Sequence, residues 1–198
     1  SRLRPLIDPP LARAAAHLVA RGVGADQVTL AAFALGMAAA IAIALGAALL
    51  ALVLIFASRL GDGLDGAVAR LTTKTDRGGY LDIVLDFAFY AAIPLAFAAA
   101  DPPANALPAA FLLASFLANG AAFLAFAIMA EKRALHTAAQ GEKSLYYAMG
   151  LVEGTETIAF FCLFCVLPTW FGWLATAMAL ACLVSAIARI VAAYWVLG

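Results

Sequence analysis

Four of the twelve acidic residues in this 198-residue chain lie close together in the sequence, with regular spacing. Asp62 and Asp65 are three residues apart, and Asp82 and Asp86 are four residues apart. Residues at these spacings share one face of an α-helix. The connection TTKTDRGG is short enough for the two helices to run antiparallel as neighbours. We therefore expect the four carboxylates to meet at one end of a helix pair.

Four neighbouring carboxylates carry a charge of about −4 and repel one another unless cations neutralise them. Arg70 supplies only one positive charge nearby, whereas two divalent ions would balance all four acids. Carboxylate oxygens without neighbouring His or Cys favour Mg²⁺, Mn²⁺ or Ca²⁺ over zinc. Two divalent ions beside an arginine suit in-line attack on phosphorus, so the pattern predicts phosphoryl-transfer chemistry.

Small residues accompany the carboxylates. Gly66 follows Asp65, Ala69 lies about one helical turn after Asp65, and Gly78 comes four residues before Asp82. Gly and Ala leave room for a bulky ligand to approach the helix backbone. A close contact between helices favours the same small residues, but the four ordered aspartates beside them favour ligand binding.

The composition predicts that lipid surrounds the helices that carry this site. The chain is 66% hydrophobic and 12% charged, whereas soluble domains are about 45–50% apolar and about 25% charged. The three cysteines lie in apolar runs and are expected to pack as small hydrophobic residues. Spans of about 20 residues are expected in six apolar segments, approximately 28–48, 49–69, 80–100, 107–130, 148–168 and 171–195.

Residues 1–25 differ from the rest of the chain. Leu11, Leu18 and other apolar residues recur at helical spacing, and Arg13, His17 and Arg21 recur on another face. This pattern predicts an amphipathic helix lying at the membrane interface, with ordinary packing against the helix bundle as the alternative. We expect an interfacial helix in residues 1–25 and a six-helix transmembrane domain in residues 26–198.

The positive charges predict the orientation in the membrane. All twelve Lys and Arg residues fall on one half of the six-span topology. The positive-inside rule places that half, with both termini and the aspartates, in the cytoplasm. The net charge is zero, which gives no bulk attraction for nucleic acid.

The complete pattern resembles the signature of the CDP-alcohol phosphotransferase (CDP-alcohol phosphatidyltransferase) family. It runs Asp62-x₂-Asp65-Gly66-x₂-Ala69-Arg70-x₇-Gly78-x₃-Asp82-x₃-Asp86, and every fixed position of the signature is present. The spans, the N-terminal helix and the placement of the motif extend the resemblance over the whole chain. The stretch EGTETIAFF at 153–161 is similar to a poorly characterised bacterial inner-membrane branch of this family.

This resemblance implies an all-α integral membrane enzyme of phospholipid biosynthesis, forming a homodimer in the bacterial inner membrane. Such enzymes transfer a phosphatidyl or other substituted phosphoryl group from a CDP-alcohol to a hydroxyl acceptor, releasing CMP. CDP-diacylglycerol is the expected donor. The expected acceptor is glycerol 3-phosphate, inositol phosphate, phosphatidylglycerol or another alcohol.

The resemblance also assigns roles to residues. Asp62, Asp65 and Asp82 match positions that hold two divalent ions, Mg²⁺ or Mn²⁺. Asp86 matches the residue that completes the metal site and acts as general base on the acceptor hydroxyl. The positions that match nucleotide contacts are Thr29, Gly66, Ala69, Arg70 and Gly78. Asp26 departs from the Asn that the family often shows there, and a role as a helix N-cap explains Asp26 equally well.

Acceptor contacts are expected among Arg59, Lys143, Glu153, Glu156 and Arg189. Arg189 lies in an apolar helix, where a buried arginine needs an anion or a carboxylate. An acceptor phosphate would satisfy it, as would an ion pair with Glu153 or Glu156, or extension of its side chain to the membrane surface. Acids at a helix start are also favoured by the helix dipole alone.

Two other functions compete with the transferase. A cation transporter or channel would use the aspartates as an ion path, but acids near mid-membrane or in rings are then expected. A catalytically silent scaffold of the same fold would not need all four aspartates. The clustering of the acids beside Gly and Arg favours the enzyme.

Overall fold

The structure is a computed structural model that describes residues 4–133 and 154–198. The chain divides into two compact units, residues 1–96 and 97–198. Within the described ranges both units are helical and contain no strand. The prediction of an all-α protein is therefore confirmed for this part of the chain.

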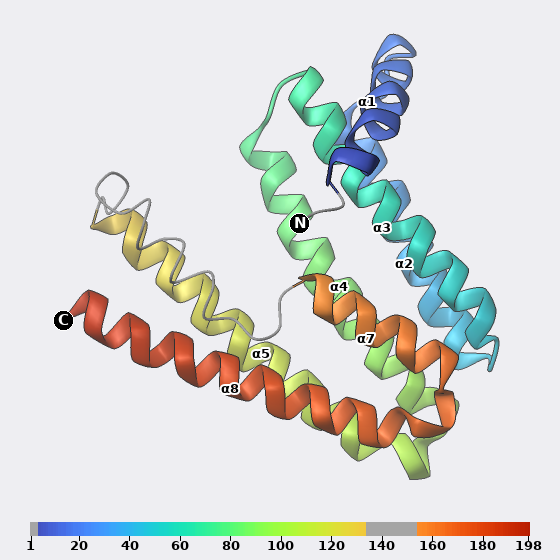
Figure 1. The fold of residues 1–198 in the computed structure, drawn as a ribbon, viewed down its shortest axis with the longest axis vertical. Coiled ribbons are helices and arrows are strands. Elements are labelled where there is room, and N and C mark those ends of the chain that lie inside the picture. Colours follow the sequence, from blue (N-terminus) through green and yellow to red (C-terminus); the bar gives the residue numbers. More distant parts are fainter. Residues whose placement is uncertain (1–3, 134–153) are drawn as a thin grey trace. The chain divides into compact units, whose positions relative to one another are not determined.

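The first unit contains three complete helices and most of a fourth (Figure 1). These are α1 (Arg4–Ala20), α2 (Ala25–Ala44), α3 (Ala48–Leu71) and α4 (Asp76–Ala100). The second unit begins with the last turn of α4. It continues through α5 (Pro102–Lys132), α7 (Gly154–Val166), a short 3-10 turn (Pro168–Trp170) and α8 (Phe171–Leu197).

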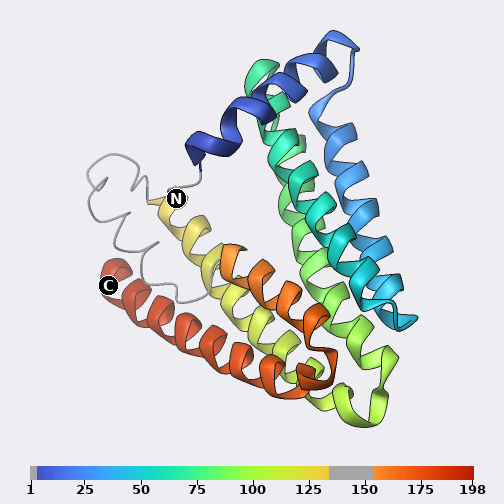
Figure 2. The same cartoon turned by 45° about the vertical axis from the view of Figure 1, so that its right-hand side comes forward.

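Helices α2 and α3 form an antiparallel hairpin (Figures 1 and 2). The chain reverses at Gly46, whose φ of 78° lies in the left-handed region that favours glycine. The two helices approach closely, because a Cβ built on Gly61 would lie 2.8 Å from the Cβ of Ala32. Ser58 crosses the same contact and donates to the carbonyl oxygen of Ala32 at 2.8 Å.

Helix α1 packs on the end of this hairpin. Ala15 is fully buried in a cluster with Val28 of α2 and with Ala67 and Val68 of α3. The apolar face predicted within residues 1–25 therefore contacts protein, which is the packing alternative. The placement of α1 at a membrane interface stays a prediction.

Helix α4 reaches α2 through an aromatic side chain. Phe89 is fully buried, and a Cβ built on Gly36 of α2 would lie 2.6 Å from its Cδ2 atom. Only glycine leaves this space, so Phe89 fixes α4 against α2. Asp86 comes one turn before Phe89, and Asp82 one turn before Asp86.

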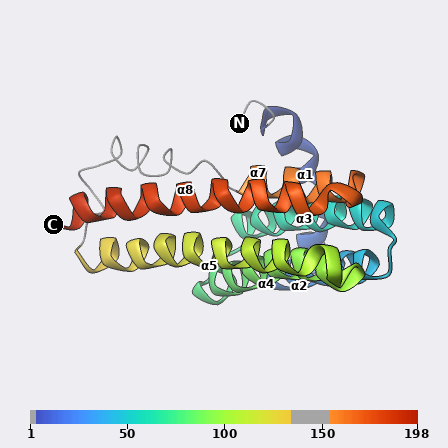
Figure 3. The same cartoon turned by 90° about the horizontal axis from the view of Figure 1, so that it is seen from below.

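In the second unit, α5 and α8 run side by side (Figure 3). Phe97, at the end of α4, stacks on Phe171 with ring centroids 4.5 Å apart, and Phe164 meets Phe171 edge-on at 5.1 Å. Cys165 and Cys182 are buried and Cys162 is half-buried, and all three are free thiols. They pack as predicted.

Four described helical segments are long and apolar enough to cross a membrane: Ala25–Ala44, Asp76–Ala100, Pro102–Lys132 and Pro168–Leu197. Large apolar side chains such as Ile41 and Val53 are exposed on the helices, as lipid-facing side chains would be. The chain is therefore an integral membrane protein, and it is all-α throughout the residues that the structure describes.

The count of six spans stays a prediction. Helix α3 carries Arg59, Asp62 and Asp65, and α7 is only 13 residues long. These two helices correspond to the expected spans 49–69 and 148–168. Residues 148–153 of the latter span lie outside the described residues.

Candidate active site

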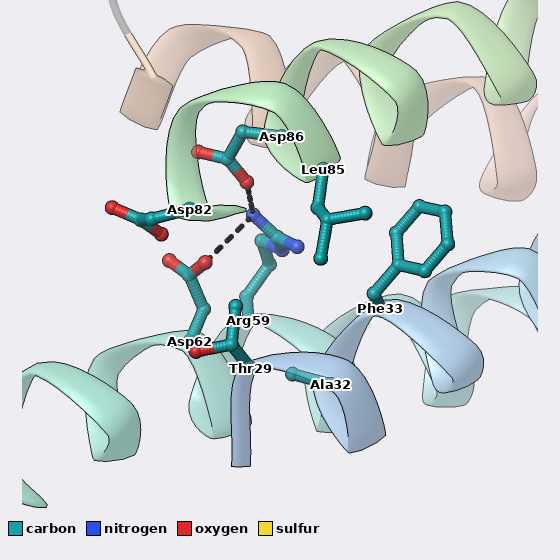
Figure 4. A pocket seen from close by; sticks show the side chains of 8 residues that line it. All are labelled: Thr29, Ala32, Phe33, Arg59, Asp62, Asp82, Leu85 and Asp86. Carbon is teal, nitrogen blue, oxygen red and sulfur yellow. Dashed lines mark hydrogen bonds and ion pairs between the residues drawn. The ribbon is translucent and has the colours of Figure 1, made fainter. Parts of the chain in front are cut away.

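Three of the predicted carboxylates meet in the first unit. Asp62 on α3 and Asp82 and Asp86 on α4 each offer one oxygen atom, and these atoms all lie within 4.8 Å of one another (Figure 4). They line a small, partly open pocket together with Thr29, Ala32, Phe33, Arg59 and Leu85. A group of three carboxylate oxygens is the donor set that Mg²⁺ and Mn²⁺ prefer, so the residues present fit a divalent cation.

Asp65 is not a member of this group of three. It is buried, and the hydroxyl of Thr29 on α2 donates to its Oδ2 atom at 2.6 Å. A step of three residues rotates a side chain about 60° from its starting direction around the helix, so Asp65 turns from α4 toward α2. Three of the four carboxylates therefore meet as predicted. The fourth, Asp65, is hydrogen-bonded to Thr29 instead.

An arginine lies between two of the three carboxylates. Arg59 Nη1 donates to Asp86 Oδ1 at 2.8 Å and lies 3.5 Å from Asp62 Oδ1 (Figure 4). The nearby positive charge expected from Arg70 comes from Arg59, whereas Arg70 is exposed at the end of α3. The Arg59–Asp62 pair could have been predicted from the sequence, because oppositely charged residues at i, i+3 spacing can pair on a helix.

Two uncharged contacts hold the Arg59 guanidinium in place. Its Nη2 atom donates to Ser58 Oγ at 3.1 Å, and its central carbon lies 4.3 Å from the centroid of the Phe89 ring. Aromatic faces attract guanidinium groups at this distance. The sequence did not identify Ser58 or Phe89 as site residues, because an isolated serine or phenylalanine in an apolar helix carries no distinct signal.

The predicted nucleotide positions surround this pocket only in part. Thr29 lines it, but its hydroxyl lies 2.6 Å from Asp65 Oδ2 and 3.1 Å from the carbonyl oxygen of Ala25. A Cβ built on Gly66 would meet Arg70 Nη1 at 3.6 Å, an ordinary contact. Ala69 is half-buried in the last turns of α3.

Asp26 and Gly78 join the beginnings of α2 and α4. Asp26 Oδ2 pairs with Arg77 Nη2 at 2.6 Å, and a Cβ built on Gly78 would lie 3.2 Å from Asp26 Oδ1. The interpretation of Asp26 as an N-cap is wrong, because Gly24 occupies the cap position and Asp26 lies in the first turn. Its carboxylate instead links the start of α2 to the start of α4.

The predicted acceptor residues are distributed over both units. Arg59 lies within the carboxylate group described above. Glu156 is exposed in the first turn of α7. Arg189 on α8 is 6% exposed, and its guanidinium lies 5.3 Å from the Phe123 ring centroid, which does not fit extension to the membrane surface. Lys143 and Glu153 lie outside the described residues.

Comparison with known proteins agrees with the family that the aspartate motif resembles. The family model described as CDP-alcohol phosphatidyltransferase matches residues 23–192. The chain is 48% identical over 170 residues to Inner membrane protein YnjF of Escherichia coli (strain K12), covering 86% of this chain and 82% of that protein. It is 33% identical over 87 residues to Archaetidylinositol phosphate synthase of Pyrococcus horikoshii, covering 43% of this chain and 46% of that protein.

Proposed function

Because this chain belongs to the CDP-alcohol phosphatidyltransferase family, we propose that it transfers a phosphatidyl group from CDP-diacylglycerol to a hydroxyl acceptor and releases CMP. The chain is a phosphotransferase by its family. The observation that carries the more specific proposal is the meeting of Asp62, Asp82 and Asp86 in one pocket. The arrangement suits a substrate with a strongly anionic diphosphate, because a divalent cation joins such a group to carboxylates.

Two divalent ions, Mg²⁺ or Mn²⁺, are the proposed cofactors, held by Asp62, Asp65, Asp82 and Asp86. When bound, they supply positive charge that offsets the charge developing on the departing CMP phosphate. Asp65 takes part from a position fixed by Thr29. The Thr29 hydroxyl would thereby orient the Asp65 carboxylate for this role.

Asp86 is the proposed general base. As the acceptor oxygen forms its bond to phosphorus, the bond from phosphorus to the diphosphate bridging oxygen breaks, and that electron pair leaves with CMP. The proton of the acceptor hydroxyl goes to an Asp86 carboxylate oxygen, because an alcohol has a high pKa and is a weak nucleophile until it loses its proton. Asp86 lines the pocket from α4, opposite Thr29 and Ala32 of α2.

Substrate contacts complete the proposal. Thr29, Gly66, Ala69, Arg70 and Gly78 are the proposed nucleotide-binding positions. The proposed acceptor contacts are Arg59, Lys143, Glu153, Glu156 and Arg189. The similarity to a protein named archaetidylinositol phosphate synthase supports a phosphorylated polyol such as inositol phosphate as the acceptor, with glycerol 3-phosphate and phosphatidylglycerol as further candidates.

We place the protein in the bacterial inner membrane as a multi-pass homodimer, with the active site and both termini in the cytoplasm. The name of the Escherichia coli relative supports the compartment, and the distribution of Lys and Arg supports the orientation. The acyl chains of the donor would then stay in the bilayer while its headgroup reaches the carboxylates. A cation channel is a weaker alternative, because Arg59 lies between two of the carboxylates that would line the ion path.

The deciding experiment measures CMP release by the purified full-length chain in detergent. CDP-diacylglycerol, Mn²⁺ or Mg²⁺ and a panel of alcohols are supplied, each alcohol separately. We expect metal-dependent CMP release with one acceptor well above the rate without an acceptor. If no acceptor in the panel gives CMP, the transfer proposed here is wrong.

A further inference from the structure

We propose that Arg59 is a built-in counter-cation of the carboxylate site, and that divalent cations bind in competition with it. This inference rests on the proposed function, because it concerns the same carboxylates. Arg59 then has two effects on the protein. It stabilises the acid cluster when no divalent cation is bound, and it lowers the affinity of the site for the metal.

The geometry shows which carboxylates are shared. Asp62 and Asp86 are two of the three acids whose oxygens lie within 4.8 Å of one another. Arg59 Nη1 contacts both of them, at 3.5 Å and 2.8 Å. A metal ion that takes ligands from Asp62 and Asp86 would bring its positive charge next to this nitrogen.

Partial burial makes the competition strong. The Arg59 side chain is only 15% exposed, and those of Asp62 and Asp86 are 34% and 30% exposed. Charges that are shielded from water interact more strongly than charges at a surface. Repulsion between the guanidinium and a divalent cation is therefore weakly screened, and it opposes metal binding.

The other contacts of Arg59 explain how its ion pairs with Asp62 and Asp86 can break when a metal ion binds. Its stacking on Phe89 and its bond to Ser58 Oγ do not involve carboxylates. Ser58 is itself fixed by its bond to the carbonyl oxygen of Ala32. The guanidinium can therefore stay on the Phe89 ring while the short side chains of Asp62 and Asp86 turn toward a metal.

The hydrogen bonding of Arg59 is incomplete. Its Nε atom is buried and has no hydrogen-bond partner among the described residues. A purely structural buried arginine normally has its donors satisfied. The unpaired Nε therefore fits an arginine that pairs with the carboxylates only while no metal ion is bound to them.

The test compares Mn²⁺ binding by the full-length chain and its variants in detergent. Free aqueous Mn²⁺ is followed by its electron paramagnetic resonance signal, which falls as the ion binds. The variants are Arg59→Gln, which removes the charge, and Arg59→Lys, which keeps the charge but lacks the planar fork. Arg77→Gln is the matched control, because it removes one positive charge from an arginine paired with Asp26, outside the group of three.

We expect Arg59→Gln to bind Mn²⁺ about tenfold more tightly than the unmodified chain, with Arg59→Lys between the two. Arg77→Gln should bind Mn²⁺ as the unmodified chain does. Equal or weaker binding by Arg59→Gln would overturn the proposal. If Arg59→Gln does not fold, Arg59→Met, which also removes the charge, decides, and binding no tighter than that of the unmodified chain overturns the proposal.

The proposed function can fail separately. Metal-dependent CMP release by the unmodified chain, together with unchanged Mn²⁺ affinity in Arg59→Gln, would contradict only the role of Arg59. The absence of Mn²⁺ binding in the unmodified chain and all variants would overturn both this inference and the metal dependence of the proposed reaction.

Discussion

Thr29 and Asp65 are 36 residues apart in the sequence, yet the hydroxyl of Thr29 donates to Asp65 Oδ2 across the α2–α3 contact at 2.6 Å. This bond sets the direction of a carboxylate that lies outside the group of three formed by Asp62, Asp82 and Asp86. The hairpin can bring the two residues together because Gly61 lets α3 approach Ala32 of α2. The position of Asp65 therefore depends on packing between helices as well as on the motif.

The first prediction removes this bond. Thr29→Val keeps the shape of the side chain but removes the hydroxyl that donates to the buried carboxylate of Asp65, at a cost of about 1–3 kcal/mol. We expect a lower midpoint of thermal unfolding in detergent and slower CMP release. Thr29→Ser should retain both properties.

Thr176→Val is the control for this loss of a hydroxyl. Thr176 donates to the carbonyl oxygen of Gly172 in its own helix at 2.8 Å, so its removal leaves no carboxylate unpaired. A fall in stability as large as that of Thr29→Val would mean that the bond to Asp65 has no special importance.

The second prediction concerns the proposed base. Asp86→Asn keeps the size of the side chain but cannot take the acceptor proton, so turnover should fall by about 10²–10⁴. Binding of CDP-diacylglycerol, measured by equilibrium titration, should change much less. Near-normal turnover in this variant would rule out Asp86 as the base.

Asp101→Asn is the comparison for this neutralised acid. Asp101 caps α5 by accepting from the Ala104 amide at 3.3 Å, and asparagine caps helices about as well. We expect the rate of CMP release to stay that of the unmodified chain. A similar loss in both variants would point to a general effect of removing negative charge.

The third prediction concerns the close contact of α2 and α3 at Gly61 and Ala32. The new methyl group in Gly61→Ala would lie 2.8 Å from the Cβ of Ala32, so the helices must separate. Overpacking of this kind costs about 1–3 kcal/mol, and the thermal unfolding midpoint should fall. CMP release should fall with it, because Thr29 and Asp65 move apart.

Gly63→Ala provides a matched test on the same helix. Its methyl group would come no closer than 3.9 Å to Leu11 Cδ1, an ordinary contact. Alanine favours a helix over glycine by about 1 kcal/mol, so the stability should stay equal or rise. If both substitutions lower the midpoint alike, the Gly61–Ala32 contact does not limit the packing.

The fourth prediction concerns metal removal. A chelator such as EDTA should abolish CMP release, because the carboxylates alone cannot balance the negative charge of the diphosphate. Added Mg²⁺ or Mn²⁺ in excess should restore the rate. A rate that survives complete chelation would exclude the proposed cofactors.

Local spacing made much of the site predictable. The spacings of Asp62, Asp82 and Asp86, with a short connection between their helices, are enough to place the three acids at one end of a helix pair. The structure brings these three together. The family could also be predicted, because the motif fixes both the order and the spacing of its residues.

The partners of Asp65 and Arg59 could not be predicted in the same way. The bond from Thr29 depends on how far α3 is rotated relative to α2, which helical spacing alone does not specify. The pairing of Arg59 depends on the rotamer of a long side chain and on the ring of Phe89 beneath it. In the sequence, Phe89 is one of 13 phenylalanines in an apolar chain, and nothing local distinguishes it from a lipid-facing residue.

The packing of α1 has a consequence for how homologous sequences can vary. Ala15 has no exposed surface and shares its cluster with Val28, Ala67 and Val68, so a larger residue at position 15 needs a smaller one opposite. Position 67 lies only two residues after Asp65 on the same helix. Changes in α1 should therefore covary with changes beside the aspartate motif, although Ala15 is not among the residues that line the pocket.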